Sequence, residues 1–161
     1  MNNVIALVLH KKVKPLFVLL IVFAISLIVT HLLKSHLDYG ISGRIALSSM
    51  LVFTSIGHFV FNKGMVQMLP DFLRYKRLIV YVTGIFEIVA AIGILFTPLK
   101  MITGVFLILF FIIVLPANIY AAVHRVNYET GEFDGKGSSY LWFRIPFQVF
   151  LIVWTFYFAV R

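Results

Sequence analysis

Apolar residues dominate five long stretches of this chain, and polar residues gather in the segments between them. The stretches lie at Pro15–Leu33, Ile41–Phe61, Leu78–Phe96, Lys100–Val123 and Tyr140–Val160. Each has roughly the 20 residues that an α-helix needs to cross a hydrocarbon core about 30 Å thick. The pattern therefore predicts an all-α membrane protein with five transmembrane helices.

The composition also favours a lipid environment. Of the 161 residues, 61% are hydrophobic and 12% are charged, and the mean hydropathy is +1.02. A soluble domain of this length cannot bury so much apolar surface. The first apolar stretch is too long for a cleavable signal peptide, so we expect it to remain as a helix. A shorter apolar run, Val4–Leu9, is expected to lie on the membrane surface.

Basic residues are distributed unequally between the two ends of the predicted helices. One side receives Lys11, Lys12, Lys14, Lys63, Arg74, Lys76, Arg77, Arg125, Lys136 and Arg144. The other side receives Lys34, Arg44, Lys100 and Arg161. Because basic residues are retained on the cytoplasmic side, this predicts a cytoplasmic N-terminus and an external C-terminus. The net charge of +8 is then a topology signal that also attracts anionic lipid headgroups, and it requires no nucleic-acid partner.

Cysteine is absent from the chain. This excludes disulfides, thiolate metal sites and a dithiol relay for electrons. A redox role would therefore need a bound cofactor or a partner protein, and we predict no metal site.

Polar residues inside the apolar stretches are the candidate functional residues. Glu87 lies at the middle of its stretch, where a carboxylate is costly unless it has a partner or a use. Helical periodicity and a rise of about 1.5 Å per residue place His58, Asn118 and Arg144 on inward faces near the cytoplasmic surface, with Gln148 slightly deeper. We expect these five residues to form one pocket.

Each candidate residue has a functional and a structural interpretation. Glu87 is either a proton-accepting group in a ligand pocket or half of a structural ion pair with Arg144. His58 either hydrogen-bonds a ligand carbonyl or relays a proton between cytosol and pocket, or it is an interior histidine tied to a neighbouring helix. The amides of Asn118 and Gln148 suit either a ligand carbonyl or hydrogen bonds between helices.

Four short motifs follow one another along the predicted helices. They are Gly57-His58-Phe59, Tyr81-x-x-Gly84-x-x-Glu87, Pro116-Ala117-Asn118-Ile119-Tyr120 and Arg144-x-Pro146-x-Gln148. In order and spacing, over roughly residues 41–157, they resemble the DoxX-like family of small polytopic membrane proteins. The resemblance implies a four-helix transmembrane bundle at residues 41–161, preceded by an N-terminal segment, residues 1–40, with one additional transmembrane helix.

The resemblance also implies a location and a role. The DoxX-like family takes its name from a subunit associated with a membrane thiosulfate:quinone oxidoreductase. We therefore expect a bacterial inner-membrane protein that is a subunit of, or accessory to, a redox complex with a partner protein, and that binds a quinone or lipid-like ligand. Two alternatives are a non-catalytic assembly or stress-associated protein with a structural polar core, and an enzyme acting on an amphipathic lipid. The phenylalanine-rich faces suit membrane lipid or a second copy of the chain equally well.

Overall fold

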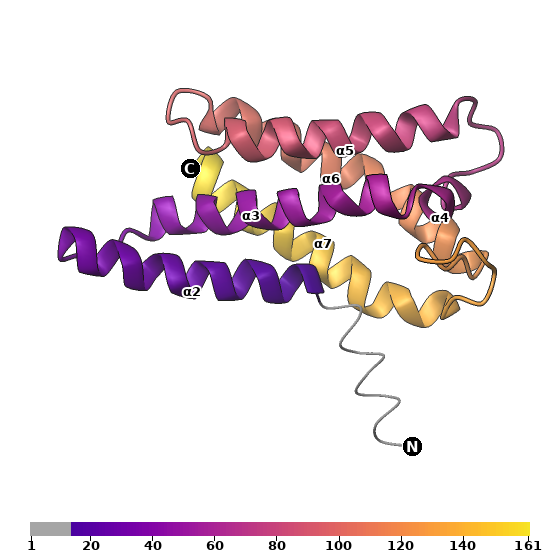
Figure 1. Ribbon diagram of the computed structural model, residues 1–161, viewed down its shortest axis with the longest axis horizontal. Helices are drawn as coiled ribbons and strands as arrows, with labels where there is room; N and C mark the ends of the chain where they lie inside the picture. The colour runs from indigo at the N-terminus through magenta and orange to yellow at the C-terminus, as the bar shows by residue number, and fades with distance from the viewer. Residues whose placement is uncertain (1–13) are drawn as a thin grey trace, which may run out of the picture.

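The structure, a computed structural model, describes residues 14–161 as a bundle of helices (Figure 1). It consists of α2 (Lys14–Lys34), α3 (Tyr39–Val60), α4 (Asn62–Gln67), α5 (Lys76–Gly93), α6 (Lys100–Val123), a 3-10 turn η1 (Gly137–Tyr140), α7 (Leu141–Thr155) and a π-helical turn η2 (Phe156–Val160). No strand occurs within residues 14–161, which confirms the predicted all-α class. The expected surface run Val4–Leu9 lies outside the described residues, as do Lys11 and Lys12.

Four of the helical segments are long and apolar enough to cross a membrane. They are α2, α3, α6 and the continuous segment Gly137–Val160, which joins η1, α7 and η2. Helix α5 has 18 residues and carries Lys76, Arg77 and Glu87, and it is not one of these four. The apolar helices fit the predicted membrane protein, and a crossing by α5 stays a prediction.

The long helices alternate in direction along the bundle (Figure 1). The α2–α3 and α5–α6 connections lie at one end together with the C-terminus. Helix α4 and the long loop between α6 and α7 lie at the opposite end, where α7 begins, and α2 begins partway along the bundle. The two substantial connections therefore share one end of the bundle, and the short ones share the other.

Local sequence explains where the helices begin and end. The Asp38 side chain accepts a hydrogen bond from the Ile41 amide (3.0 Å) and caps the start of α3, which satisfies one of the unpaired N–H groups of the first turn. Ser35 follows α2, Tyr75 precedes α5 and Arg125 follows α6, all with φ near +55°. These left-handed residues change the direction of the chain between the helices.

Helix α3 is the centre of the packing and contacts both α2 and α5. The Ser48 hydroxyl donates to the Ala91 carbonyl across the α3–α5 contact (2.7 Å). A glycine at position 84 brings the two backbones together, because a Cβ there would lie 2.7 Å from the His58 Cβ. The α3–α5 pair is therefore closely packed at the depth of the predicted pocket.

Helix α2 packs on the outer side of α3. Its buried residues are Leu19, Ser26 and Thr30, and most of its remaining surface is exposed and apolar. The Phe23 ring lies 5.0 Å from the Trp154 ring of α7. The additional N-terminal helix is thus joined to the bundle along one face only.

Candidate functional site

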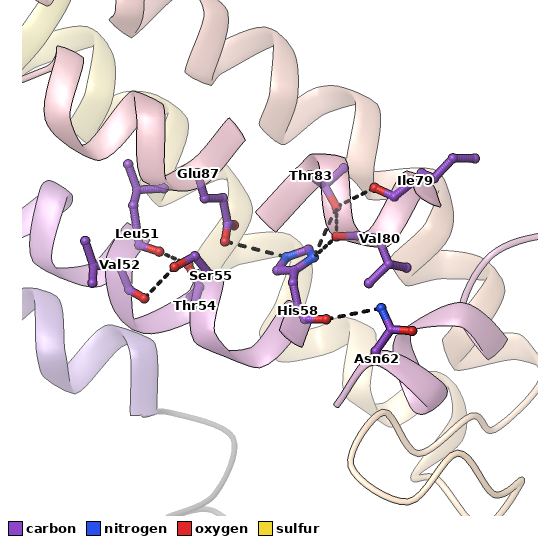
Figure 2. A network of polar contacts seen from close by, with 10 residues as sticks. All are labelled: Leu51, Val52, Thr54, Ser55, His58, Asn62, Ile79, Val80, Thr83 and Glu87. Atoms are coloured by element: carbon purple, nitrogen blue, oxygen red, sulfur yellow. Dashed lines mark hydrogen bonds and ion pairs between the residues drawn. The ribbon is translucent and has the colours of Figure 1, made fainter. Parts of the chain in front are cut away.

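Two of the predicted site residues, His58 and Glu87, are in direct contact (Figure 2). His58 lies in the last turn of α3, and Glu87 lies in the middle of α5. The His58 Nε2 atom is 3.5 Å from the Glu87 Oε2 atom, and the two side chains are 17% and 8% exposed. The α3–α5 packing therefore places an imidazole beside a buried carboxylate.

The other nitrogen of His58 identifies which ring atom carries a proton. His58 Nδ1 lies 3.1 Å from the Val80 carbonyl oxygen and 3.1 Å from the Thr83 hydroxyl. That hydroxyl is within donating distance of the Ile79 and Val80 carbonyls. Because a carbonyl oxygen only accepts, Nδ1 must be the donor and carry a hydrogen.

This assignment places a shared proton between His58 and Glu87. With Nδ1 protonated, a neutral imidazole presents a lone pair at Nε2, which would face the lone pairs of an ionised Glu87 carboxylate. The contact is favourable only when one further proton is present, either on Nε2 or on the carboxyl group. The pair therefore holds one exchangeable proton in a buried position.

The contacts of the carboxylate are incomplete. Within residues 14–161, Glu87 Oε2 is buried and has no hydrogen-bond partner, since its approach to His58 is long for a hydrogen bond. Thr54 lies close to the carboxylate and donates its hydroxyl to the Leu51 carbonyl (3.0 Å). Glu87 can therefore accept, or when protonated donate, one more hydrogen bond.

Arg144, near the start of α7, acts on this pair through its charge. Its guanidinium attracts the Glu87 carboxylate and disfavours a second positive charge on His58. Among the described residues no ion pair joins Arg144 directly to Glu87, so the structural Glu87–Arg144 pair considered from the sequence is replaced by His58–Glu87. The Arg144 Nε atom is buried without a hydrogen-bond partner in the described part of the chain.

Asn118 and Gln148 have a different arrangement from the other three. The Asn118 amide donates to the Val114 carbonyl of its own helix (3.1 Å). The Gln148 amide donates to the Phe111 carbonyl and thereby links α7 to α6. Pro116 cannot donate to the carbonyl four residues earlier, and a helix is loosened around such a position. The two amide groups thus add hydrogen bonds to backbone carbonyls of α6.

Residues 47–159 match the model of a family described only as a domain of unknown function, DUF8561. The chain belongs to the DUF8561 family. The matched region begins within α3 and ends in η2, so it contains all five candidate residues and leaves α2 outside. No curated protein and no solved structure matches the chain.

The loop between α6 and α7 covers the same end of the DUF8561 bundle. The Tyr128 ring packs edge-on against Phe61 with centroids 5.9 Å apart. The loop approaches α4 at Gly64, where a Cβ would lie 2.0 Å from the Tyr128 carbonyl oxygen. Burial raises the pKa of Tyr128 to about 12, so this phenol stays neutral.

Turn hydrogen bonds hold this covering loop in place. The Asn127 amide donates to Asp134 (3.0 Å), and the Asn127 carbonyl accepts from the Gly131 amide (2.7 Å). A cavity of about 250 Å³ lies under the loop, and its lining includes Tyr128 and Lys136 but neither His58 nor Glu87. No hydrophobic periodicity marks this loop, so Tyr128 could not be identified as a covering residue from sequence.

Three of the five predicted residues of the DUF8561 chain therefore act on one another. The His58 imidazole of α3 and the Glu87 carboxylate of α5 are in contact, and the Arg144 guanidinium of α7 acts on both through its charge. Asn118 and Gln148 are bound to backbone carbonyls. Within residues 14–161, no group of three histidine or acidic side chains is suited to hold a metal ion. The chemistry that this arrangement supports is proton exchange and hydrogen bonding with a polar group of a ligand.

Proposed function

We propose that this chain is a multi-pass protein of the bacterial inner membrane with a cytoplasmic N-terminus and an external C-terminus. The support is the apolar surface of the long helices and the concentration of basic residues at one end. In this placement α5 also crosses the membrane, which makes five crossing helices. The positions of its three charged residues are compatible with a crossing. Lys76 and Arg77 lie at its cytoplasmic end, and Glu87 faces His58.

Within that placement, the function is binding a quinone or another lipid-like ligand as a subunit of, or accessory to, a redox complex. The DoxX-like motifs suggest this role, and His58, Glu87 and Arg144 supply suitable chemistry. Quinone reduction takes up protons at carbonyl oxygens, and the His58–Glu87 pair holds a proton that it can exchange. A partner protein or a bound cofactor would supply the electrons, because a chain without cysteine has no dithiol to pass them.

One observation carries this proposal: a buried carboxylate beside a histidine retains an unused hydrogen-bonding position. Leaving such a group unsatisfied costs about 1–3 kcal/mol, and more when it is charged. A ligand hydroxyl or carbonyl at Glu87 would remove that cost. Intramembrane ionisable residues commonly mark ligand or proton pathways for the same reason.

A second candidate function is a non-catalytic assembly protein with a structural polar core. Hydrogen bonds to backbone carbonyls favour it, because Ser48, His58 and Gln148 each contact a carbonyl of a neighbouring helix. Such bonds hold membrane helices together without any ligand. This role accounts for the amides and for Ser48, and leaves Glu87 and Arg144 without an explanation.

The test is to purify the protein in mild detergent and identify co-extracted small molecules by lipid-directed mass spectrometry. Wild type should retain a quinone or one lipid class, and Glu87→Gln should reduce that species by about tenfold or more, the equivalent of one hydrogen bond to a charged group. Arg44→Ala is the matched control at the other end of α3 and should leave the species unchanged. Equal amounts of bulk membrane lipid in all three samples would eliminate the ligand site and favour the structural role. If a ligand is found, a co-purifying redox protein would show that the chain is a subunit of a complex and not a free ligand carrier.

A further inference from the structure

A second, apolar groove separates the N-terminal halves of α2 and α7. Its lining consists only of apolar side chains: Leu16, Leu20, Trp142, Phe143, Pro146, Phe147 and Phe150. Its volume is about 360 Å³. Helix α7 begins at the end of the bundle that carries α4 and the covering loop, and α2 begins partway along the bundle, in the half nearer to that end (Figure 1). The groove therefore lies in the half of the bundle that we place in the cytoplasmic leaflet.

The groove is a wedge that closes toward the external end of the bundle. Deeper along the helices, Phe23 of α2 lies 5.0 Å from Trp154 and 5.7 Å from Phe158. Phe150 joins this cluster, with its ring 5.4 Å from the Trp154 ring. Aromatic contact thus joins the two helices at the closed end. Leu16 of α2 and Trp142 of α7 both line the groove.

The lining of this space favours a hydrocarbon chain as its occupant, because all of its side chains are apolar. A single acyl chain is narrow enough to enter the wedge and needs no hydrogen-bond partner from its walls.

The entrance of the groove has the chemistry of a headgroup site. Lys14 begins α2 two residues before Leu16, and its side chain is exposed. Trp142 is 86% exposed, and tryptophan is favoured at the level of lipid headgroups. A lysine near the membrane surface attracts anionic lipid by about 1 kcal/mol. The positive charge of Lys14 and the apolar groove beside it therefore both favour an anionic lipid as the ligand.

We propose that the groove between α2 and α7 binds one anionic phospholipid of the cytoplasmic leaflet, with an acyl chain in the wedge and its phosphate near Lys14. The inference rests on the membrane placement proposed above and is independent of the His58–Glu87 centre. On α7 the groove residues are centred on a different face from Arg144 and Gln148, because helical periodicity places the centres of the two sets about 150° apart around the helix. The bound lipid would fasten α2, which lies outside the DUF8561 match, to the last helix.

The test uses native mass spectrometry of protein taken from vesicles of equal phosphatidylglycerol and phosphatidylcholine. Wild type should retain one phosphatidylglycerol, and Leu20→Trp should lose it because an indole fills the wedge. Ile21→Trp is the matched control, since position 21 is 54% exposed and is not part of the groove lining. Lys14→Gln should lower the preference for phosphatidylglycerol by about fivefold, the equivalent of one lysine at the surface.

Equal retention by Leu20→Trp and Ile21→Trp would overturn the proposal, as would equal retention of the two lipids by wild type. A wild-type dimer that Leu20→Trp converts to monomer would also overturn it and identify a second copy as the occupant. Each variant should first match wild type in elution volume and helix content, and Leu16→Trp replaces Leu20→Trp if that variant does not fold. Glu87→Gln should keep the phosphatidylglycerol. The proposal of this lipid site and the proposal of the quinone site can therefore be refuted independently. Release of the protein from membranes without detergent would instead refute the membrane placement.

Discussion

The α3–α5 contact and the α6–α7 contact both contain buried polar side chains, but the amides of the second are bound to carbonyls, whereas the carboxylate of the first is not satisfied. Between α6 and α7, the Gln148 amide donates to a backbone carbonyl, and Asn118 does the same within α6. Between α3 and α5, Glu87 retains an unpartnered oxygen beside His58. Amides that donate to backbone carbonyls hold helices together. A buried carboxylate that can still form a hydrogen bond is costly unless it has a function. The comparison separates residues that stabilise the bundle from residues that could bind a ligand.

The largest expected effect comes from removing the histidine of the α3–α5 contact. His58→Leu leaves Glu87 buried opposite an apolar group, and breaking such a pair costs about 3 kcal/mol. Thermal unfolding in detergent should show a clear loss of stability. The double variant His58→Leu/Glu87→Leu should recover most of it, because the buried carboxylate is removed together with its histidine partner. Additive losses in the double variant would show that the two residues do not act as a pair.

Two glycines provide an intermediate test that distinguishes the contacts. A Cβ at Gly84 would lie 2.7 Å from the His58 Cβ, and a Cβ at Gly104 would lie 2.9 Å from the Ala159 Cβ. Overpacking of this kind costs about 1–3 kcal/mol, so Gly84→Ala and Gly104→Ala should lower the unfolding temperature similarly. Only Gly84→Ala should also reduce the co-extracted ligand, since it moves His58 relative to Glu87. Loss of ligand in both variants would mean that binding follows general stability.

The smallest expected effect is at the amide of α7. Gln148→Leu removes one hydrogen bond between membrane helices, which costs about 0.6 kcal/mol on average and at most about 1.7 kcal/mol. The unfolding temperature should fall slightly, and the amount of co-extracted ligand should stay at the wild-type level. A ligand loss as large as that of Glu87→Gln would place Gln148 in the binding site and remove the distinction between the two contacts.

Hydrophobic periodicity was sufficient to predict the helices and the inward faces. The five apolar stretches agree with the long helices within a few residues, because length and apolar content determine such helices almost alone. The same periodicity placed His58 and Glu87 on faces that the structure shows as buried or nearly so. These features depend on local sequence and needed no knowledge of how the helices pack.

Pairing between the helices could not be predicted in the same way. The sequence offered Arg144 as the ion-pair partner of Glu87, but the nearest charged or titrating atom is His58 Nε2. That choice depends on how closely α3 approaches α5, which Gly84 and the Ser48–Ala91 bond determine. The direction of the Gln148 amide likewise depends on the carbonyl of Phe111 in another helix. Such contacts follow from helix rotation and separation, which periodicity leaves undetermined.

The hydrogen bond from Trp154 to the Gly43 carbonyl (3.1 Å) joins positions 111 residues apart and therefore affects the order of assembly. At synthesis rates of about 5–20 residues per second, roughly 6–22 s separate the translation of these two residues. During that interval α3 and α5 have no α7 beside them, and Glu87 lacks the compensating charge of Arg144. In the membrane placement proposed above, the earlier helices stay in the membrane or in the insertion machinery until the last helix is made. The buried carboxylate at position 87 is therefore least stabilised during synthesis, before α7 is present.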